Sequence, residues 1–133
     1  MIDNTHRFQG YGSLRFVYQK GDTIRGPFCS LKFIMNRRRK TYRAAVVVSR
    51  KVHKSAVVRN RIRRRIYEII RTNEQRIKAP FDLVFIVYNE QLATMPGEEL
   101  QTTILEKLAK AGVFTNDPTP NEAQRAIVER KEN

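Results

Sequence analysis

The amino-acid sequence predicts a small two-layer α+β domain, in which one short sheet is covered by helices. Its 133 residues suit a single domain, and 41% of them are apolar and can supply a core. Three short apolar segments, residues 28–35, 44–49 and 82–88, are typical of buried strands. Two longer segments, residues 54–71 and 98–111, carry apolar residues at steps of three and four, which is the spacing of amphipathic helices.

A short helix is predicted before the first strand. Residues 11–20 place apolar side chains at helical spacing, and Gly21 is a suitable residue to end the helix. The strands at residues 28–35 and 44–49 are joined by a short, very basic connection. Because strands that follow one another in the chain usually pair, we expect these two to form an antiparallel hairpin.

The helix predicted at residues 54–71 has two chemically opposite sides. At about 100° per residue, its apolar side chains fall within an arc of roughly 120° and must face a core. This apolar stripe comprises Val58, Ile62, Ile66, Ile69 and Ile70. Ser55 occupies the position of an N-cap. The polar side, including its border, comprises Arg59, Asn60, Arg61, Arg63, Arg64, Arg65, Glu68 and Arg71.

Positive charge is concentrated in the middle of the chain. Residues 23–67 contain 15 Lys and Arg and no Asp or Glu, whereas residues 68–133 contain 8 Lys and Arg and 11 Asp and Glu. Five of the seven residues from Arg59 to Arg65 are arginines, which repel one another on a helix. Arginine donates paired hydrogen bonds to phosphate, so this one-sided charge predicts a nucleic-acid partner. An acidic membrane surface is less favoured, because an interfacial helix would present bulky apolar residues to lipid.

The chain divides into a domain at residues 1–112 and a tail at residues 113–133. The helix at residues 98–111 ends at Gly112, and the tail contains prolines and a thin apolar face, so we expect it to be loosely attached. A single cysteine, Cys29, excludes an internal disulfide and is expected to be a small buried residue. The first residues lack the apolar run of a signal peptide, and no segment could span a membrane, so we expect a cytoplasmic protein.

The sequence shows no constellation of catalytic residues. The two histidines and Cys29 do not form a metal-binding cluster, and a nucleophilic triad and a glycine-rich phosphate loop are both missing. Four aromatic residues near the basic region could instead stack on unpaired bases, although core packing is the ordinary role of such residues and only for Tyr18 are the two roles evenly balanced. They are Tyr11, Phe16, Tyr18 and Phe28.

The segment at residues 49–71 resembles the signature of the bacterial ribonuclease P protein component. The family has a Ser-Lys-Lys turn, an Arg-Asn-Arg helix start and an Ile-Lys-Arg continuation. Here these motifs read Ser49-Arg50-Lys51, Arg59-Asn60-Arg61 and Ile62-Arg63-Arg64. The short aromatic helix before the first strand, the strand at residues 82–88 and the closing helix also match, so the resemblance covers about residues 6–111.

The resemblance implies a specific fold. The residues alone give the order α-β-β-α-β-α, whereas the family has α-β-β-β-α-β-α in a fold like ribosomal protein S5 domain 2. It also implies a left-handed β-α-β crossover through the arginine-rich helix, although general rules favour right-handed crossovers.

The resemblance also implies a function, namely assisting a catalytic RNA that removes 5′ leaders from precursor tRNA. The protein then binds no cofactor itself, and Mg²⁺ is expected to act through the RNA. The residues that would bind the RNA subunit are Arg50, Lys51, Lys54, Arg59, Asn60, Arg61, Arg63, Arg64 and Arg65. Those that would bind the single-stranded leader are Leu14, Phe16, Tyr18, Arg63 and Tyr67. Leu14 stands where the family has an aromatic residue, and Tyr67 stands where the family often has a basic one.

Two other functions would explain the same charge. A ribosomal or other structural RNA-binding protein is the leading alternative, and a DNA-binding module is the second. Exposed aromatic side chains beside the arginine-rich helix would favour a site for single-stranded nucleic acid over both.

Overall fold

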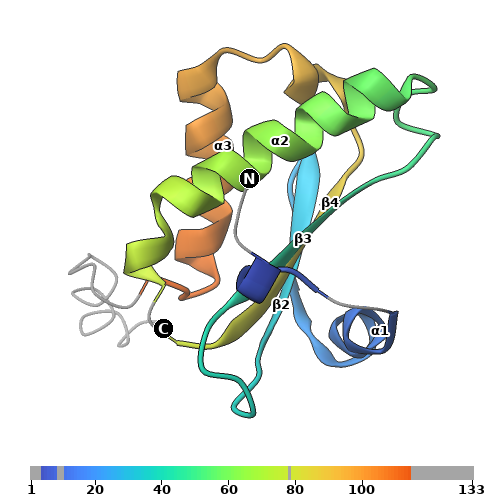
Figure 1. Cartoon of the computed structure of the whole chain (residues 1–133). Coiled ribbons are helices and arrows are strands. Elements are labelled where there is room, and N and C mark those ends of the chain that lie inside the picture. Colours follow the sequence, from blue (N-terminus) through green and yellow to red (C-terminus); the bar gives the residue numbers. More distant parts are fainter. Residues whose placement is uncertain (1–3, 9–10, 78, 115–133) are drawn as a thin grey trace.

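The computed structural model describes residues 4–8, 11–77 and 79–114, which form one four-stranded mixed sheet with helices on both faces. The two long helices cover one face of the sheet, and the first helix lies against the other (Figure 1). The elements are η1 (Asn4–His6), α1 (Tyr11–Lys20), β1 (Asp22–Ile24), β2 (Cys29–Met35), β3 (Arg43–Val48), α2 (Ala56–Thr72), η2 (Glu74–Arg76), β4 (Phe81–Val87), η3 (Glu90–Ala93) and α3 (Gly97–Lys110).

The order of strands in the sheet is β1-β2-β4-β3, with β4 antiparallel to β2 and parallel to β3. The predicted hairpin between residues 28–35 and 44–49 is therefore wrong, because β4 lies between these two strands. Phe85 of β4 is opposite Leu31 on one side and Val46 on the other. All of β4 except Ile86 is buried, and a strand that is apolar apart from Asp82 is best accommodated at the centre of a sheet.

The observed order of elements is the one that the family resemblance implied. The additional strand is β1, which pairs with β2 through residues 22–24. It has only three residues and no alternation of apolar side chains, so the sequence pattern alone did not predict it. β3, α2 and β4 form a parallel β-α-β unit. The left-handed crossover through this unit stays a prediction.

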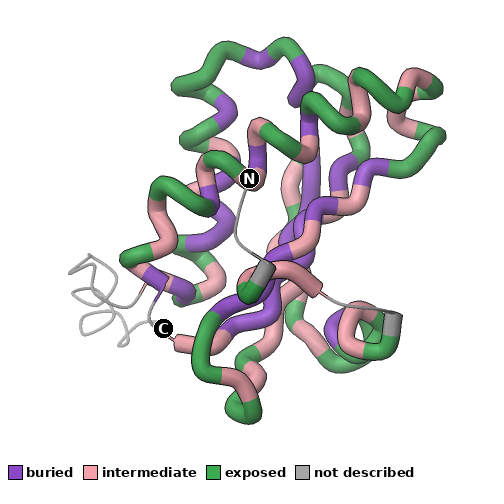
Figure 2. The backbone as a smooth tube through the Cα atoms, viewed as in Figure 1, coloured by how far each residue is buried: buried purple, intermediate pink, exposed green. Residues whose placement is uncertain are grey.

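The core lies between the sheet and the pair α2 and α3. Figure 2 shows the buried positions on the sides of these helices that meet the sheet and each other. The predicted stripe on α2 is confirmed, since Ile62, Ile66 and Ile70 are completely buried, and Val58 and Ile69 are partly buried against them. The N-cap is also confirmed, because the side chain of Ser55 accepts a hydrogen bond from the backbone N–H of Val58. Cys29 is fully buried, as predicted, and burial raises the pKa of its thiol.

The described part of the domain continues two residues beyond the predicted boundary at Gly112. Gly112 has a φ of 76° and ends α3 in the left-handed conformation that glycine tolerates. Val113 is then fully buried, and Phe114 forms an isolated β-bridge with Ile77. The ring centroid of Phe114 lies 4.0 Å from Cζ of the Arg76 guanidinium. Residues 115–133 lie outside the described residues, so the loose attachment of the tail stays a prediction.

Two truncations test where the stable domain ends. A chain ending at Phe114 should unfold at nearly the same temperature as the full chain. A chain ending at Gly112 should lose about 1.5–3 kcal/mol, because it lacks the buried side chain of Val113. For a domain of this size, that corresponds to a thermal midpoint roughly 5–20 °C lower. Equal midpoints for the two truncated chains, measured by circular dichroism, would contradict this boundary.

Candidate nucleic-acid interface

The turn that leads into α2 is held by hydrogen bonds within the chain. The ring Nδ1 of His53 accepts the backbone N–H of Ser55 at 3.0 Å. The guanidinium of Arg59 donates to the carbonyl oxygens of His53 and Lys54 at 3.0 and 2.8 Å. Arg59, predicted to bind RNA, therefore also fixes the start of the helix. The side chains of Arg50, Lys51 and Lys54 are exposed around this turn, as an RNA-binding role requires.

Two of the arginines predicted to bind RNA donate hydrogen bonds to backbone carbonyls of the neighbouring segment around η3. Arg61 donates from Nε to the carbonyl of Ala93 at 2.9 Å. Arg65 donates from Nη1 to Leu92 at 2.7 Å and from Nη2 to Met95 at 2.5 Å. Burial lowers the pKa of Arg65, and the positive charge of Arg61 lowers it further. Both arginines were predicted to bind RNA, and the structure shows in addition that both donate to the carbonyls around η3.

The open edge of β3 is covered by two further residues of α2. The hydroxyl of Tyr67 accepts the backbone N–H of Val46 at 3.1 Å, and burial raises the pKa of this phenol. Arg63 donates to the carbonyl of Val48 at 3.4 Å and to the side chain of Asn60 at 2.6 Å. Unpaired groups on an edge strand invite pairing with another chain, so these contacts protect β3. Arg63 and Tyr67, both predicted to bind the leader, have this structural role as well.

Arg64 is the clearest candidate for contact with an external anion. It is exposed, and it forms no hydrogen bond or ion pair with any residue that the structure describes. Its neighbours on either side, Arg63 and Arg65, both donate to backbone carbonyls. Further along α2, Arg71 forms an ion pair with Glu68 and is partly neutralised. The open positive charge is therefore at Arg64 and around the turn before the helix.

α1 lies on the opposite face of the sheet and exposes aromatic residues on both of its flanks. Val17 is fully buried and faces the sheet, whereas Phe16 is 45% and Tyr18 is 41% exposed. Successive residues of a helix are about 100° apart, so Phe16 and Tyr18 lie on opposite sides of α1. Leu14 is half-buried and lies one turn before Tyr18, on the same flank. The structure thus groups Leu14 with Tyr18 and separates Phe16 from both.

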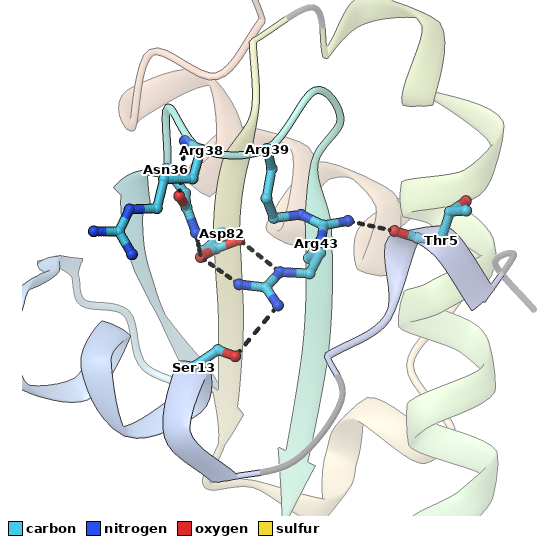
Figure 3. A network of polar contacts seen from close by, with 7 residues as sticks. All are labelled: Thr5, Ser13, Asn36, Arg38, Arg39, Arg43 and Asp82. Carbon is cyan, nitrogen blue, oxygen red and sulfur yellow. Dashed lines mark hydrogen bonds and ion pairs between the residues drawn. The ribbon is translucent and has the colours of Figure 1, made fainter.

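A buried ion pair beneath α1 was not predicted from the sequence. The guanidinium of Arg43 donates to both oxygens of Asp82, at 3.0 and 2.9 Å, and also to Ser13 of α1 at 3.3 Å (Figure 3). Asn36 donates to the same carboxylate at 3.1 Å. Asp82 is 1% exposed, and such a buried charge requires a partner of this kind. A single acidic residue at the start of an otherwise apolar strand was the signal in the sequence.

Two observations bound the site further. Within the described residues, no three His, Cys, Asp or Glu side chains are grouped so that they could hold a metal ion. Among the same residues, no helix is long and apolar enough to cross a membrane.

Comparison with known proteins identifies the family. The family model for ribonuclease P matches residues 2–112. The chain is 35% identical over 115 residues to the ribonuclease P protein component of Pseudanabaena sp. (strain PCC 6903), covering 86% of this chain and 97% of that one. It is 36% identical over 106 residues to the protein of the same name from Chloroflexus aurantiacus (strain ATCC 29366 / DSM 635 / J-10-fl), covering 80% of this chain and 77% of that one.

A solved structure shares the fold. It is a Staphylococcus aureus RNase P protein mutant with defective mRNA degradation activity, which superposes with a TM-score of 0.75 at 23% identity. The alignment covers 84% of this chain and 92% of that one. With the arginine-rich α2 seated on a four-stranded mixed sheet and a family match over most of its length, the chain belongs to the bacterial ribonuclease P protein family.

Proposed function

We propose that the chain is the protein subunit of a ribonuclease P enzyme, binding its catalytic RNA and the 5′ leader of precursor tRNA. Membership of the family supports a role in this ribonucleoprotein complex and partnership with an RNA subunit. The observation that carries the proposal is Arg64, an exposed arginine that is left open between two arginines held by backbone carbonyls. Arginine recognises phosphate oxygens through its planar fork of donors.

The leader is proposed to lie on the other face, beside Leu14 and Tyr18. The sheet residues on that face include Ala45, Val47 and Ile86, which are only partly buried. An exposed tyrosine beside a partly open apolar surface can stack on an unpaired base. The RNA-subunit contacts on α2 and the leader contacts of Leu14 and Tyr18 on α1 then lie on opposite faces of the sheet, whereas Arg63 and Tyr67, also predicted to bind the leader, are on α2.

Hydrolysis is proposed to be carried out by the RNA subunit, with Mg²⁺ acting through that RNA in the cytoplasm. The protein contributes positive charge and positioning.

Alanine variants of two adjacent arginines on α2 test whether RNA binding can be weakened without lowering the stability of the fold. Arg64→Ala should weaken binding to the catalytic RNA while changing the free energy of unfolding by less than about 0.5 kcal/mol. Arg65→Ala removes the same charge but also two hydrogen bonds to η3, so it should lower the free energy of unfolding by about 1–3 kcal/mol. Urea denaturation and filter binding measure the two effects. Equal stability of the two variants would contradict the division of the arginines.

Tyr18→Ala tests the leader site on the reconstituted enzyme. Loss of one stacked base should raise the dissociation constant for leader-bearing precursor by about tenfold. Affinity for mature tRNA, which lacks the leader, should be nearly unchanged. A similar loss for both substrates, in a variant with a normal thermal midpoint, would place Tyr18 outside the leader site.

The same preparation supplies the control for catalysis. Protein freed of RNA should leave precursor tRNA intact, whereas protein combined with the catalytic RNA should release the leader. Leader release by the RNA-free protein would refute the assignment of hydrolysis to the RNA.

A further inference from the structure

A hollow lies on the flank of α1 that faces away from Tyr18. It encloses about 370 Å³ between α1 and the loop that joins β2 to β3. Its size is within the range of about 300–1,000 Å³ found for sites that bind small molecules. It is lined by Ser13, Phe16, Asn36, Arg38, Arg43 and Asp82. Phe16, predicted from the sequence to share the leader site, belongs to this hollow.

The floor of the hollow is a rigid polar group. The buried pair of Arg43 and Asp82 is fixed by Ser13 from α1 and by Asn36 from the end of β2. A guanidinium has five N–H donors, and these contacts use three from Arg43, so two have no partner among the described residues. The carboxylate of Asp82 is 1% exposed and already accepts three hydrogen bonds, so what the floor has left for a ligand is the remaining N–H donors of Arg43, which is 7% exposed.

The walls combine an aromatic ring with a positive charge. Phe16 is 45% exposed, and Arg38 is exposed on the loop opposite. The backbone N–H of Arg38 donates to the side chain of Asn36 at 3.1 Å, which anchors the loop to the floor (Figure 3). A single exposed aromatic residue is ordinary on a protein surface. Here, however, it borders a hollow whose opposite wall is a free arginine.

We propose that this hollow binds one unpaired nucleotide of an RNA chain, with the base stacked on Phe16 and the phosphate held by Arg38. A base edge carries acceptors, which match the two N–H donors of Arg43 that have no partner among the described residues. The charge of Asp82 is balanced by its bidentate pairing with Arg43, so the net positive charge of the hollow is that of Arg38 at its wall. The proposal rests on the proposed RNA-binding function and adds a second RNA site across α1 from the leader site.

The nucleotide could come from the catalytic RNA or from the leader far upstream of the cleavage site. Both sources present the same chemistry, and binding assays distinguish them. The affinity of the full-length protein for the catalytic RNA is measured first, in the absence of precursor tRNA. The holoenzyme is then assayed for affinity toward precursor tRNAs with a short leader and with a much longer one.

Phe16→Ala, Phe16→Leu and Arg38→Ala test the walls of the hollow. Each variant loses either the stacking contact or the phosphate contact. Each should therefore weaken binding to whichever RNA supplies the nucleotide by at least about fivefold. Phe16→Leu keeps an apolar side chain without the ring, so it should lose affinity at an unchanged thermal midpoint. Arg37→Ala is the matched control, because Arg37 is an exposed arginine of the same loop that does not line the hollow, and it should lose less affinity.

Double variants test whether Phe16 and Arg38 contact the same nucleotide. Phe16→Ala and Arg38→Ala should be strongly non-additive, because they disrupt the same bound group, whereas Phe16→Ala and Tyr18→Ala should be additive. A loss confined to the catalytic RNA, or to the long-leader precursor, supports the proposal and identifies the source. Affinities within twofold of wild type for Phe16→Ala and Phe16→Leu, in a working holoenzyme, would overturn it. A wild-type chain that bound neither RNA would instead overturn the proposed function, and with it this site.

Discussion

The structure depends on placing five arginines in seven residues of one helix that must also bury an apolar side. Like charges so close together destabilise an isolated helix. In the folded protein, Arg61 and Arg65 donate to carbonyls around η3, and Arg63 donates to the edge of β3. Carbonyl oxygens stabilise these charges without adding a negative charge to the surface. The helix is therefore fixed to its neighbours by some of its arginines, while Arg64 stays open and the net charge available to a phosphate chain is preserved.

The sheet then separates the two faces that we propose bind RNA. α2 packs on one face and presents the basic surface, and α1 packs on the other with aromatic residues along both flanks. The ion pair joins Arg43 of β3 to Asp82 of β4, and it is bonded to Ser13 of α1 and to Asn36, which directly follows β2. Breaking one partner of a buried pair is costly, so this network holds α1 in a defined position on the sheet. Both proposed contacts with unpaired bases depend on that position.

Local features were predictable from the sequence, whereas features set by distant partners were not. The Ser55 cap and the buried Ile62, Ile66 and Ile70 follow from spacing within one helix. The pairing of β3 with β4 does not, because α2 and η2 separate these two strands in the chain. Arg65 was predicted to bind RNA from the family resemblance, and its hydrogen bonds to the segment around η3 were missed because the carbonyl partners lie 27 and 30 residues away in the chain. The family resemblance supplied the order of the elements, which the apolar pattern gave incompletely because β1 is so short.

The salt dependence of binding to the catalytic RNA tests the central claim most directly, namely that open charge on this protein drives assembly. Neutralising phosphates releases counterions, so the logarithm of the affinity should fall steeply and linearly with the logarithm of the salt concentration. Arg64→Ala should reduce that slope by about one phosphate contact. A nearly flat dependence for the wild-type protein, or an unchanged slope for Arg64→Ala, would contradict the claim.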